Sequence, residues 1–124
     1  MGSILVTGVD LEEIDRLRRI PEPIRGRFIA RILTRNELKK AYLSEEHIIG
    51  LFCAKEAVAK ALGCGIGVLS WQDIDIQNQE SGLPQVHLTG NAKQKADEIG
   101  VTNWSLSISH TRAYAVAFVV GTNN

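Results

Sequence analysis

The hydrophobic period of this chain changes near its midpoint, and that change limits the folds open to it. Between residues 12 and 62, apolar residues recur at the three- and four-residue spacing of amphipathic helices. After residue 70 they alternate with polar residues, as strands require, in DIDIQ, WSLSISH and YAVAFVV. We therefore predict an α+β fold, in which an antiparallel sheet packs against helices gathered earlier in the chain.

Local signals place the individual elements. A strand is expected at residues 4–11, and Gly8 inside it predicts close approach of another backbone. A helical pattern then runs from Glu12 to the helix-breaking Pro21 and Pro23. The further helices predicted are RFIARIL, residues 37–43 after a capping box at Thr34, residues 45–62 between Ser44 and Gly63, and residues 91–99 between Thr89 and Gly100. The further strands predicted are residues 73–77, 85–88, 104–110 and 114–120.

Length and composition set outer limits. A chain of 124 residues predicts one domain, residues 1–124. It contains no apolar run of roughly 18 residues and no basic segment leading into an apolar one, so neither a membrane span nor a signal peptide is expected. Two cysteines, Cys53 and Cys64, are too few for a disulfide framework. We expect both to be buried free thiols in a cytoplasmic protein.

The charge is balanced overall but unevenly distributed. The formal net charge is zero, yet residues 16–40 hold nine basic side chains and only two acidic ones, Glu22 and Glu37. Such a stretch is either a solvated helix face or a docking surface for an acidic partner. It holds a single aromatic residue, Phe28, and so lacks the series of interleaved aromatic residues that stack nucleic-acid bases.

The helix within FCAKEAVAKALGCGIG, residues 52–67, carries the first candidate site. Phe52, Glu56, Lys60 and Gly63 share one predicted stripe, and Leu51, Ala54, Val58, Ala61 and Leu62 form a separate apolar stripe. Glu56 and Lys60 alone could be a surface ion pair. Glycines at 63, 65 and 67 exceed what a helix end needs, and they would let backbone N–H groups approach an anion. The order is the reverse of a P-loop, in which glycines precede the helix.

Two further residues are candidates by position. Asp10 ends an apolar strand, where its carboxylate either caps the next helix or joins Glu56 in holding a divalent cation such as Mg²⁺. His110 ends the strand of SISHT, where it is either a structural hydrogen-bonded histidine or a donor to a phosphate or reacting hydroxyl. His47 and His87 lack such a context and are interpreted as structural.

At these residues the sequence resembles the phosphopantetheinyl transferases. GVDLEEIDR resembles their first signature, G-x-D followed six residues later by Arg, and FCAKEAVAK resembles their second, F/W-x-x-K-E-A-x-x-K. The remaining segments, including RILTRNEL and SLSISHTRAYAVAFVV, are similar to the small bacterial type, holo-acyl-carrier-protein synthase. The resemblance covers almost the whole chain.

The resemblance implies a function. Enzymes of this family transfer 4′-phosphopantetheine from coenzyme A to a serine of apo-acyl carrier protein, release adenosine 3′,5′-bisphosphate, require Mg²⁺ and serve fatty acid biosynthesis. The small type has an α+β fold and assembles as a homotrimer with active sites between subunits. The expected partners are therefore coenzyme A, apo-acyl carrier protein and further copies of the chain, rather than nucleic acid or membrane.

The resemblance also implies roles for particular residues. Asp10 and Glu56 are expected to hold the metal, Lys60 to face the pyrophosphate, and Glu56 or a metal-bound water to act as base. The groups expected around the nucleotide are Gly63, Gly65, Gly67, His110 and Thr111. The arginines expected to dock the acidic carrier protein are Arg16, Arg19, Arg25 and Arg27.

One position departs from the family pattern. Leu51 stands where the family usually has an arginine before the aromatic residue of the second signature. Either the grip on the nucleotide is weaker, or Arg112 or another arginine compensates. Two other functions remain open from the residues alone: a different Mg²⁺-dependent nucleotide or pyrophosphate transferase or hydrolase, and a nucleic-acid-binding module using the basic region.

Overall fold

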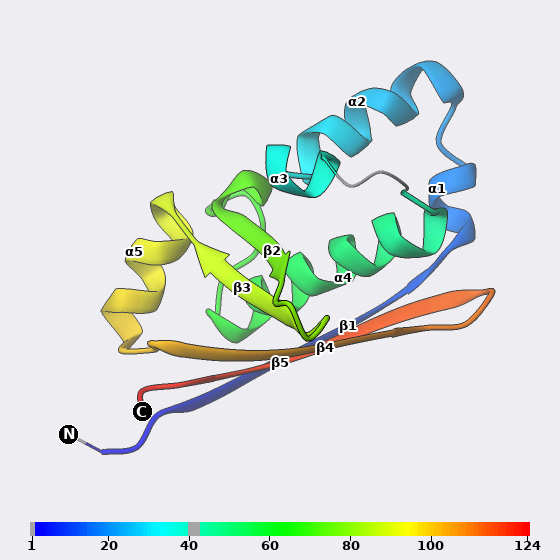
Figure 1. Cartoon of the computed structure of the whole chain (residues 1–124). Coiled ribbons are helices and arrows are strands. Elements are labelled where there is room, and N and C mark those ends of the chain that lie inside the picture. Colours follow the sequence, from blue (N-terminus) through cyan, green and yellow to red (C-terminus); the bar gives the residue numbers. More distant parts are fainter. Residues whose placement is uncertain (1, 40–42) are drawn as a thin grey trace.

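A three-stranded antiparallel sheet forms the base of the molecule and is covered on one face by helices (Figure 1). The computed structural model describes residues 2–39 and 43–124. The strands are β1 (Leu5–Glu13), β4 (Asn103–His110) and β5 (Tyr114–Thr122), in the order β1-β5-β4. The first and last strands of the sequence are thus neighbours, and both chain ends lie at the same end of the sheet (Figure 1). The predicted α+β architecture is confirmed.

The longest helix, α4 (Glu45–Ala61), lies directly on this sheet (Figure 1). It begins where predicted, with the Ser44 hydroxyl accepting a hydrogen bond from the His47 N–H. From residue 48 to 61 every residue is buried except Glu56 and Lys60. The residues of the predicted apolar stripe are all buried, but Phe52 is buried as well, because neighbouring elements surround the helix on nearly all sides.

Gly8 allows strand and helix to meet at backbone distance. A Cβ atom at this position would lie 1.9 Å from the carbonyl oxygen of Ala57 on α4. Any side chain here would force the strand away from the helix. The close approach predicted for Gly8 is confirmed.

The basic region folds differently from the prediction in three places. The β1 strand extends through Glu12 and Glu13, which pair with β5, so α1 (Asp15–Arg18) starts later than expected. The prolines open α2 (Glu22–Ile32), since Pro23 occupies its first turn, where no N–H partner is needed.

The helix expected at residues 37–43 is shorter than predicted. The capping box at Thr34 is present, but the helix that it starts, α3, spans only Arg35–Leu38. Leu43 is not helical, and residues 40–42 of that prediction lie outside the described residues.

The segment after α4 contributes a hairpin and a last helix. A short 3₁₀ turn, η1 (Trp71–Asp73), leads into strands β2 (Ile74–Asn78) and β3 (Pro84–Leu88), which form a separate antiparallel pair. Helix α5 (Gly90–Ile99) ends at Gly100, as predicted, and Gly100 has a left-handed conformation. Thr89 is its N-cap residue, but its side chain makes no capping hydrogen bond, contrary to expectation.

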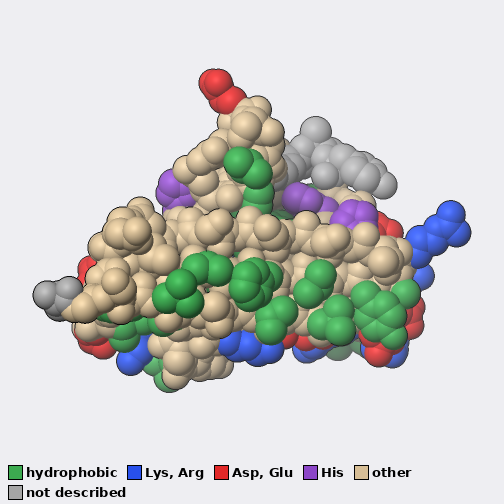
Figure 2. All heavy atoms as spheres, turned by 90° about the horizontal axis from the view of Figure 1, so that it is seen from below, with side chains coloured by type: hydrophobic (Ala, Val, Ile, Leu, Met, Phe, Trp, Pro, Cys, Tyr) green, Lys and Arg blue, Asp and Glu red, His purple; other side chains and the backbone are tan. Residues whose placement is uncertain are grey.

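No helix formed by the described residues covers the other face of the sheet (Figure 1). Figure 2 shows hydrophobic side chains gathered along this outer face. The large hydrophobic residues of β1 and β5 that are exposed there are Leu5, Val9, Leu11, Tyr114 and Phe118. Among the described residues, no helix is long and apolar enough to cross a membrane.

Candidate active site

Asp10, Glu56 and Lys60 come together where β1 crosses α4. Alternate residues of a strand share a face, so Gly8 and Asp10 both point toward the helix. The Lys60 ammonium lies 3.0 Å from Asp10 Oδ1 and donates a second hydrogen bond of 2.9 Å to the Val9 carbonyl. The only two polar side chains that α4 leaves accessible between residues 48 and 61 therefore lie beside a buried carboxylate.

The Asp10 carboxylate is incompletely satisfied. Its side chain is only 9% exposed, and one oxygen is held by Lys60. The other, Oδ2, is buried and accepts no hydrogen bond within the described part of the chain. A buried carboxylate oxygen without a partner is costly, which marks this side of Asp10 as a place for a cation or a donor.

The surroundings of Glu56 make ionisation of its carboxyl group harder than for a solvent-exposed glutamate. Burial raises the pKa of the Glu56 carboxyl, and the nearby carboxylates of Asp10 and Glu12 raise it further. Lys60 and Arg16 act in the opposite direction without cancelling the effect on the pKa. A divalent cation between Glu56 and Asp10 would remove the repulsion between their carboxylates.

These residues fit a hard divalent cation that also binds a ligand. In the described residues no three His, Cys, Asp or Glu side chains are grouped as a complete protein metal site. Two carboxylates with further positions left open match the coordination of Mg²⁺, which commonly uses one or two carboxylates plus water and phosphate oxygens. The unsatisfied Oδ2 of Asp10 supports the same assignment.

Glu12 and Arg16 are site residues that our sequence reasoning did not assign to the catalytic cluster. Glu12 lies two residues beyond Asp10 on the same face of β1, and its carboxylate pairs with Arg16 at 2.8 Å. The Arg16 guanidinium sits 4.7 Å from the centre of the Phe52 ring. The two-residue period of the strand could have revealed Glu12, but the expected helix start at that residue concealed it.

Cys53, on the same part of α4, is fully buried, which disfavours the reactive thiolate form. Burial raises the pKa of its thiol to about 12, and the carboxylates of Asp10 and Glu12 contribute. The thiol donates weakly to the Ala115 carbonyl at 3.5 Å. Cys53 is a buried free thiol as predicted, whereas Cys64 is only half-buried.

The glycine-rich segment after α4 has two positions where only glycine fits well. Gly63 has φ = 76° and Gly67 has φ = 132°, both in the region that side chains disfavour. No atom outside the neighbouring residues lies within 4 Å of a Cβ placed at either glycine or at Gly65. The segment therefore leaves open space beside the end of the helix that carries Lys60.

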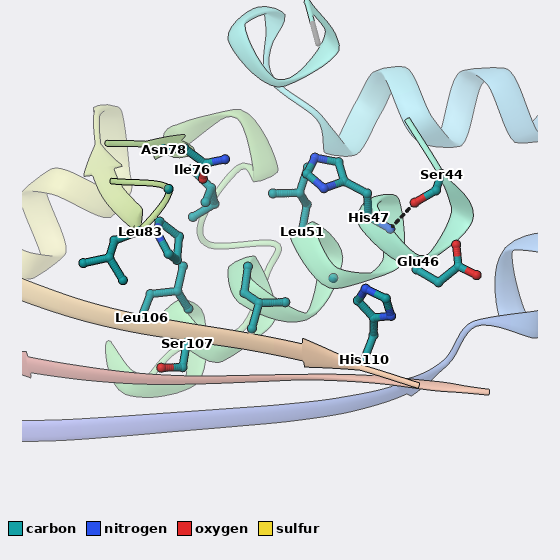
Figure 3. Close-up of a pocket in the computed structure, with 14 residues that line it drawn as sticks. Ser44, Glu46, His47, Leu51, Ile76, Asn78, Leu83, Leu106, Ser107 and His110 are labelled. Atoms are coloured by element: carbon teal, nitrogen blue, oxygen red, sulfur yellow. Dashed lines mark hydrogen bonds between the residues drawn. The ribbon is translucent and has the colours of Figure 1, made fainter. Parts of the chain in front are cut away.

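His110 and Thr111 do not join this cluster within one chain. His110 lines a cavity of about 450 Å³ between the first half of α4, strand β4 and the β2–β3 hairpin (Figure 3). Leu51 faces the same cavity, together with polar groups of Glu46 and His47 (Figure 3). The Thr111 hydroxyl accepts hydrogen bonds from the N–H groups of residues 113 and 114, which holds the β4–β5 turn.

The cavity and the carboxylate cluster lie on opposite sides of α4. His47 and Glu56 are nine residues apart, about two and a half helical turns, so they point in opposite directions. The sheet register agrees, because Asp10 pairs with Ala117 on the central strand, and Ile108 lies beyond it on β4. A ligand contacting both groups of one chain would have to cross α4.

The four arginines predicted to dock the carrier protein differ in their side-chain contacts. Arg16 pairs with Glu12, and Arg19 lies 3.9 Å from Glu13. Arg25 donates to the carbonyls of Arg18 and Ile20 and so caps the end of α1. Arg27 makes no ion pair or side-chain hydrogen bond with any described residue, which leaves its charge available to a partner.

Comparison with known proteins identifies the family. The sequence matches the 4'-phosphopantetheinyl transferase superfamily over residues 7–119. The chain therefore belongs to this superfamily, as its two signatures predicted. A holo-[acyl-carrier-protein] synthase of Natranaerobius thermophilus is 44% identical over 117 residues, covering 92% of this chain and 94% of that protein.

Solved structures agree. Helicobacter pylori holo-[acyl-carrier-protein] synthase in complex with coenzyme A has a TM-score of 0.82 and 34% identity, covering 93% of this chain and 98% of that one. A holo-(acyl-carrier-protein) synthase from Bacillus anthracis, in complex with coenzyme A (3',5'-ADP), has a TM-score of 0.78 and 32% identity, covering 99% of this chain and 100% of that one.

Proposed function

We propose that this protein transfers 4′-phosphopantetheine from coenzyme A to a serine of apo-acyl carrier protein, releasing adenosine 3′,5′-bisphosphate. The observation that carries the proposal is the cluster of Asp10, Glu56 and Lys60 at the crossing of β1 and α4. Both signatures of the family contribute to it, and relatives of similar sequence over nearly the whole chain are named holo-[acyl-carrier-protein] synthases. The usual role of this reaction is in fatty acid biosynthesis.

Each residue of the cluster has a chemical task. Asp10 Oδ2 and Glu56 would hold Mg²⁺, which neutralises charge on the pyrophosphate when bound. Lys60 is half exposed and attached through a flexible stem, so its ammonium can turn from Asp10 to a phosphate oxygen. Since the transferred group needs positioning and charge stabilisation more than covalent help, these three side chains provide most of what the reaction requires.

A proton must also leave the attacking serine hydroxyl. Burial and the neighbouring Asp10 carboxylate raise the pKa of Glu56, and a higher pKa makes a carboxylate a better proton acceptor. The same carboxylate is proposed as a metal ligand, so its two oxygens would have different partners.

We infer that further copies of the chain complete the site. Two observations support assembly, and a homotrimer is the form that the family resemblance implies. The outer sheet face exposes large hydrophobic side chains, among them Leu11 and Phe118, over a wide area of β1 and β5 (Figure 2). The cavity lined by His110 lies on the opposite side of α4 from Glu56, so the nucleotide end of coenzyme A would contact His110 and Thr111 of a neighbouring copy.

The acidic carrier protein would dock on the basic region. Arg27, which has no side-chain partner among the described residues, would pair with it directly, whereas Arg16, Arg19 and Arg25 would exchange or share their present contacts. Such charges act mainly on encounter rate and orientation. A cytoplasmic location is part of the same proposal, since both substrates of the reaction are found there.

Intact-protein mass spectrometry tests this function. Apo-acyl carrier protein is incubated with the protein, coenzyme A and Mg²⁺, and a parallel sample contains EDTA. The expected result is a metal-dependent gain of one phosphopantetheine on the carrier serine. Cleavage of coenzyme A without modification of the carrier would instead indicate a hydrolase, and absence of both reactions would refute the proposal.

A further inference from the structure

Lys55, the residue immediately before Glu56 on α4, belongs to a buried ion pair that the proposed chemistry does not use. The Lys55 ammonium lies 2.8 Å from Glu37 Oε1, and both side chains are 0% exposed. Burial lowers the pKa of Lys55, while the Glu37 carboxylate opposes that shift. Two well-packed apolar residues could fill this space without the cost of removing charges from water.

The pair connects four separate segments. The Lys55 ammonium donates to the carbonyls of Ile32 at 2.8 Å and Ile74 at 2.7 Å, and to that of Trp71 at 3.2 Å. The Glu37 carboxylate accepts the N–H groups of Thr34 at 2.9 Å and Ile76 at 2.7 Å. The end of α2, helix α3, the η1 turn and strand β2 are thereby all joined to α4.

The carbonyl groups at the C-terminal end of α2 accept hydrogen bonds from side chains of other elements. The last carbonyls of a helix have no partner inside the helix. Here the Gln72 side-chain amide donates to three carbonyls in that region, those of Ala30, Arg31 and Leu33, the last at 2.7 Å. Lys55 takes the Ile32 carbonyl, and its positive charge is favourable at a helix C-terminus.

An aromatic stack reinforces the same connection. Phe28 of α2 lies 6.1 Å from Phe52 of α4, measured between ring centres, and Phe52 lies 5.0 Å from Trp71 of η1. Helix α2 carries Arg27, whereas α4 carries Glu56. Polar and aromatic contacts thus connect the helix proposed to receive the carrier protein with the helix that carries the carboxylate proposed to act on its serine.

We propose that Glu37, Lys55 and Gln72 are positioning residues. They hold α2 at a set distance and orientation relative to Glu56, so that a docked carrier protein presents its serine at the carboxylate cluster. The inference rests on the proposed function. The reacting hydroxyl arrives on a folded protein, so the separation between docking helix and cluster must match the separation between docking face and serine. A mismatch of about 1 Å can lower a rate about 100-fold.

Gln72→Ala is the sharpest test, because the Gln72 residue is exposed and its loss leaves no buried charge. Gln94→Ala on α5 is the matched control, since Gln94 is exposed and makes no side-chain hydrogen bond with a described residue. We expect Gln72→Ala to raise the KM for carrier protein and lower kcat, for a combined loss of about 10- to 100-fold in kcat/KM. The Kd for coenzyme A should stay within about twofold, and Gln94→Ala should match wild type.

A double variant, Glu37→Gln with Lys55→Met, tests the pair itself without leaving one charge buried alone. Like Gln72→Ala, it should impair the kinetics with carrier protein while leaving coenzyme A binding unchanged. Unchanged carrier kinetics in both variants would overturn the proposal. Equal weakening of coenzyme A binding would also overturn it, because that result indicates that the whole site is destabilised rather than that α2 is displaced relative to Glu56.

Failure of the proposed function would look different. In that case wild-type protein itself transfers nothing to the carrier. Hydrogen exchange of the α2 amides then tests the positioning contact independently of activity. Faster exchange in Gln72→Ala than in Gln94→Ala would support the contact, and equal exchange would refute it.

Discussion

Glu56→Gln separates the chemical role of the carboxylate from any structural one. Glutamine keeps the shape of glutamate but carries no charge and is a poor ligand for Mg²⁺. Burial and Asp10 raise the pKa of Glu56, so its ionised form costs folding stability, and this cost appears as pH rises through the raised pKa. At neutral pH the variant should therefore unfold at the wild-type temperature or slightly above it, and the difference should vanish in acid.

The kcat of the Glu56→Gln variant should fall, even though its thermal stability is retained. Loss of one preorganised electrostatic group typically lowers kcat about 100- to 1,000-fold, equivalent to about 3–4 kcal/mol of transition-state stabilisation. Glu56 has two proposed tasks, holding the metal and accepting the proton, so the loss should reach at least the upper part of this range.

The assay is the rate of carrier modification by mass spectrometry, with a thermal unfolding curve for each protein. Glu98→Gln on α5 is the control, since it removes an exposed carboxylate far along the chain from the cluster. A variant that folds normally and retains more than about a tenth of wild-type turnover would refute the assignment of Glu56. A variant that does not fold would show instead that the carboxylate has a structural role.

Three further predictions test other parts of the argument. Gly8→Ala should lower the free energy of unfolding by about 3 kcal/mol or more, measured by chemical denaturation, because the new methyl group would overlap the Ala57 carbonyl; wild-type stability would contradict the packing. Arg27→Glu should raise the KM for carrier protein about tenfold and leave coenzyme A binding unchanged, whereas an equal loss of coenzyme A binding would move Arg27 out of the docking surface. Phe118→Glu should reduce the assembly to monomers in analytical ultracentrifugation, and an unchanged sedimentation coefficient would exclude this face as the interface.

Much of the fold was predictable because its strongest signals are local. The Ser44 cap, the Thr34 capping box and the Gly100 terminus are each specified by a few adjacent residues, and all three are present. The prediction failed at Glu12 and Glu13 because both a strand and an acidic helix start accommodate two glutamates. Pairing with β5, more than 100 residues away, decides between them.

The site was predictable in part for the same reason. Asp10, Glu56 and Lys60 lie within signatures that the sequence displays, and the structure brings Asp10 and Lys60 into contact. The partnership of Glu37 with Lys55 had no local signal, since Glu37 already had an explanation as a capping residue. Burial of a lysine depends on the four segments around it, which only the tertiary structure defines.

The contact at Gly8 also bears on how freely this sequence can vary. β1 and α4 meet there through backbone atoms, with no side chain between them. Substitutions among the aliphatic core residues change the distance between layers that touch through side chains. They should have little effect on the distance between β1 and α4 at Gly8, because there a carbonyl group lies directly against an α-carbon. Sequence changes elsewhere in the core should therefore have little effect on the distance between Asp10 on the strand and Glu56 and Lys60 on the helix. A large part of the interior can then vary in sequence while the reacting groups keep their positions.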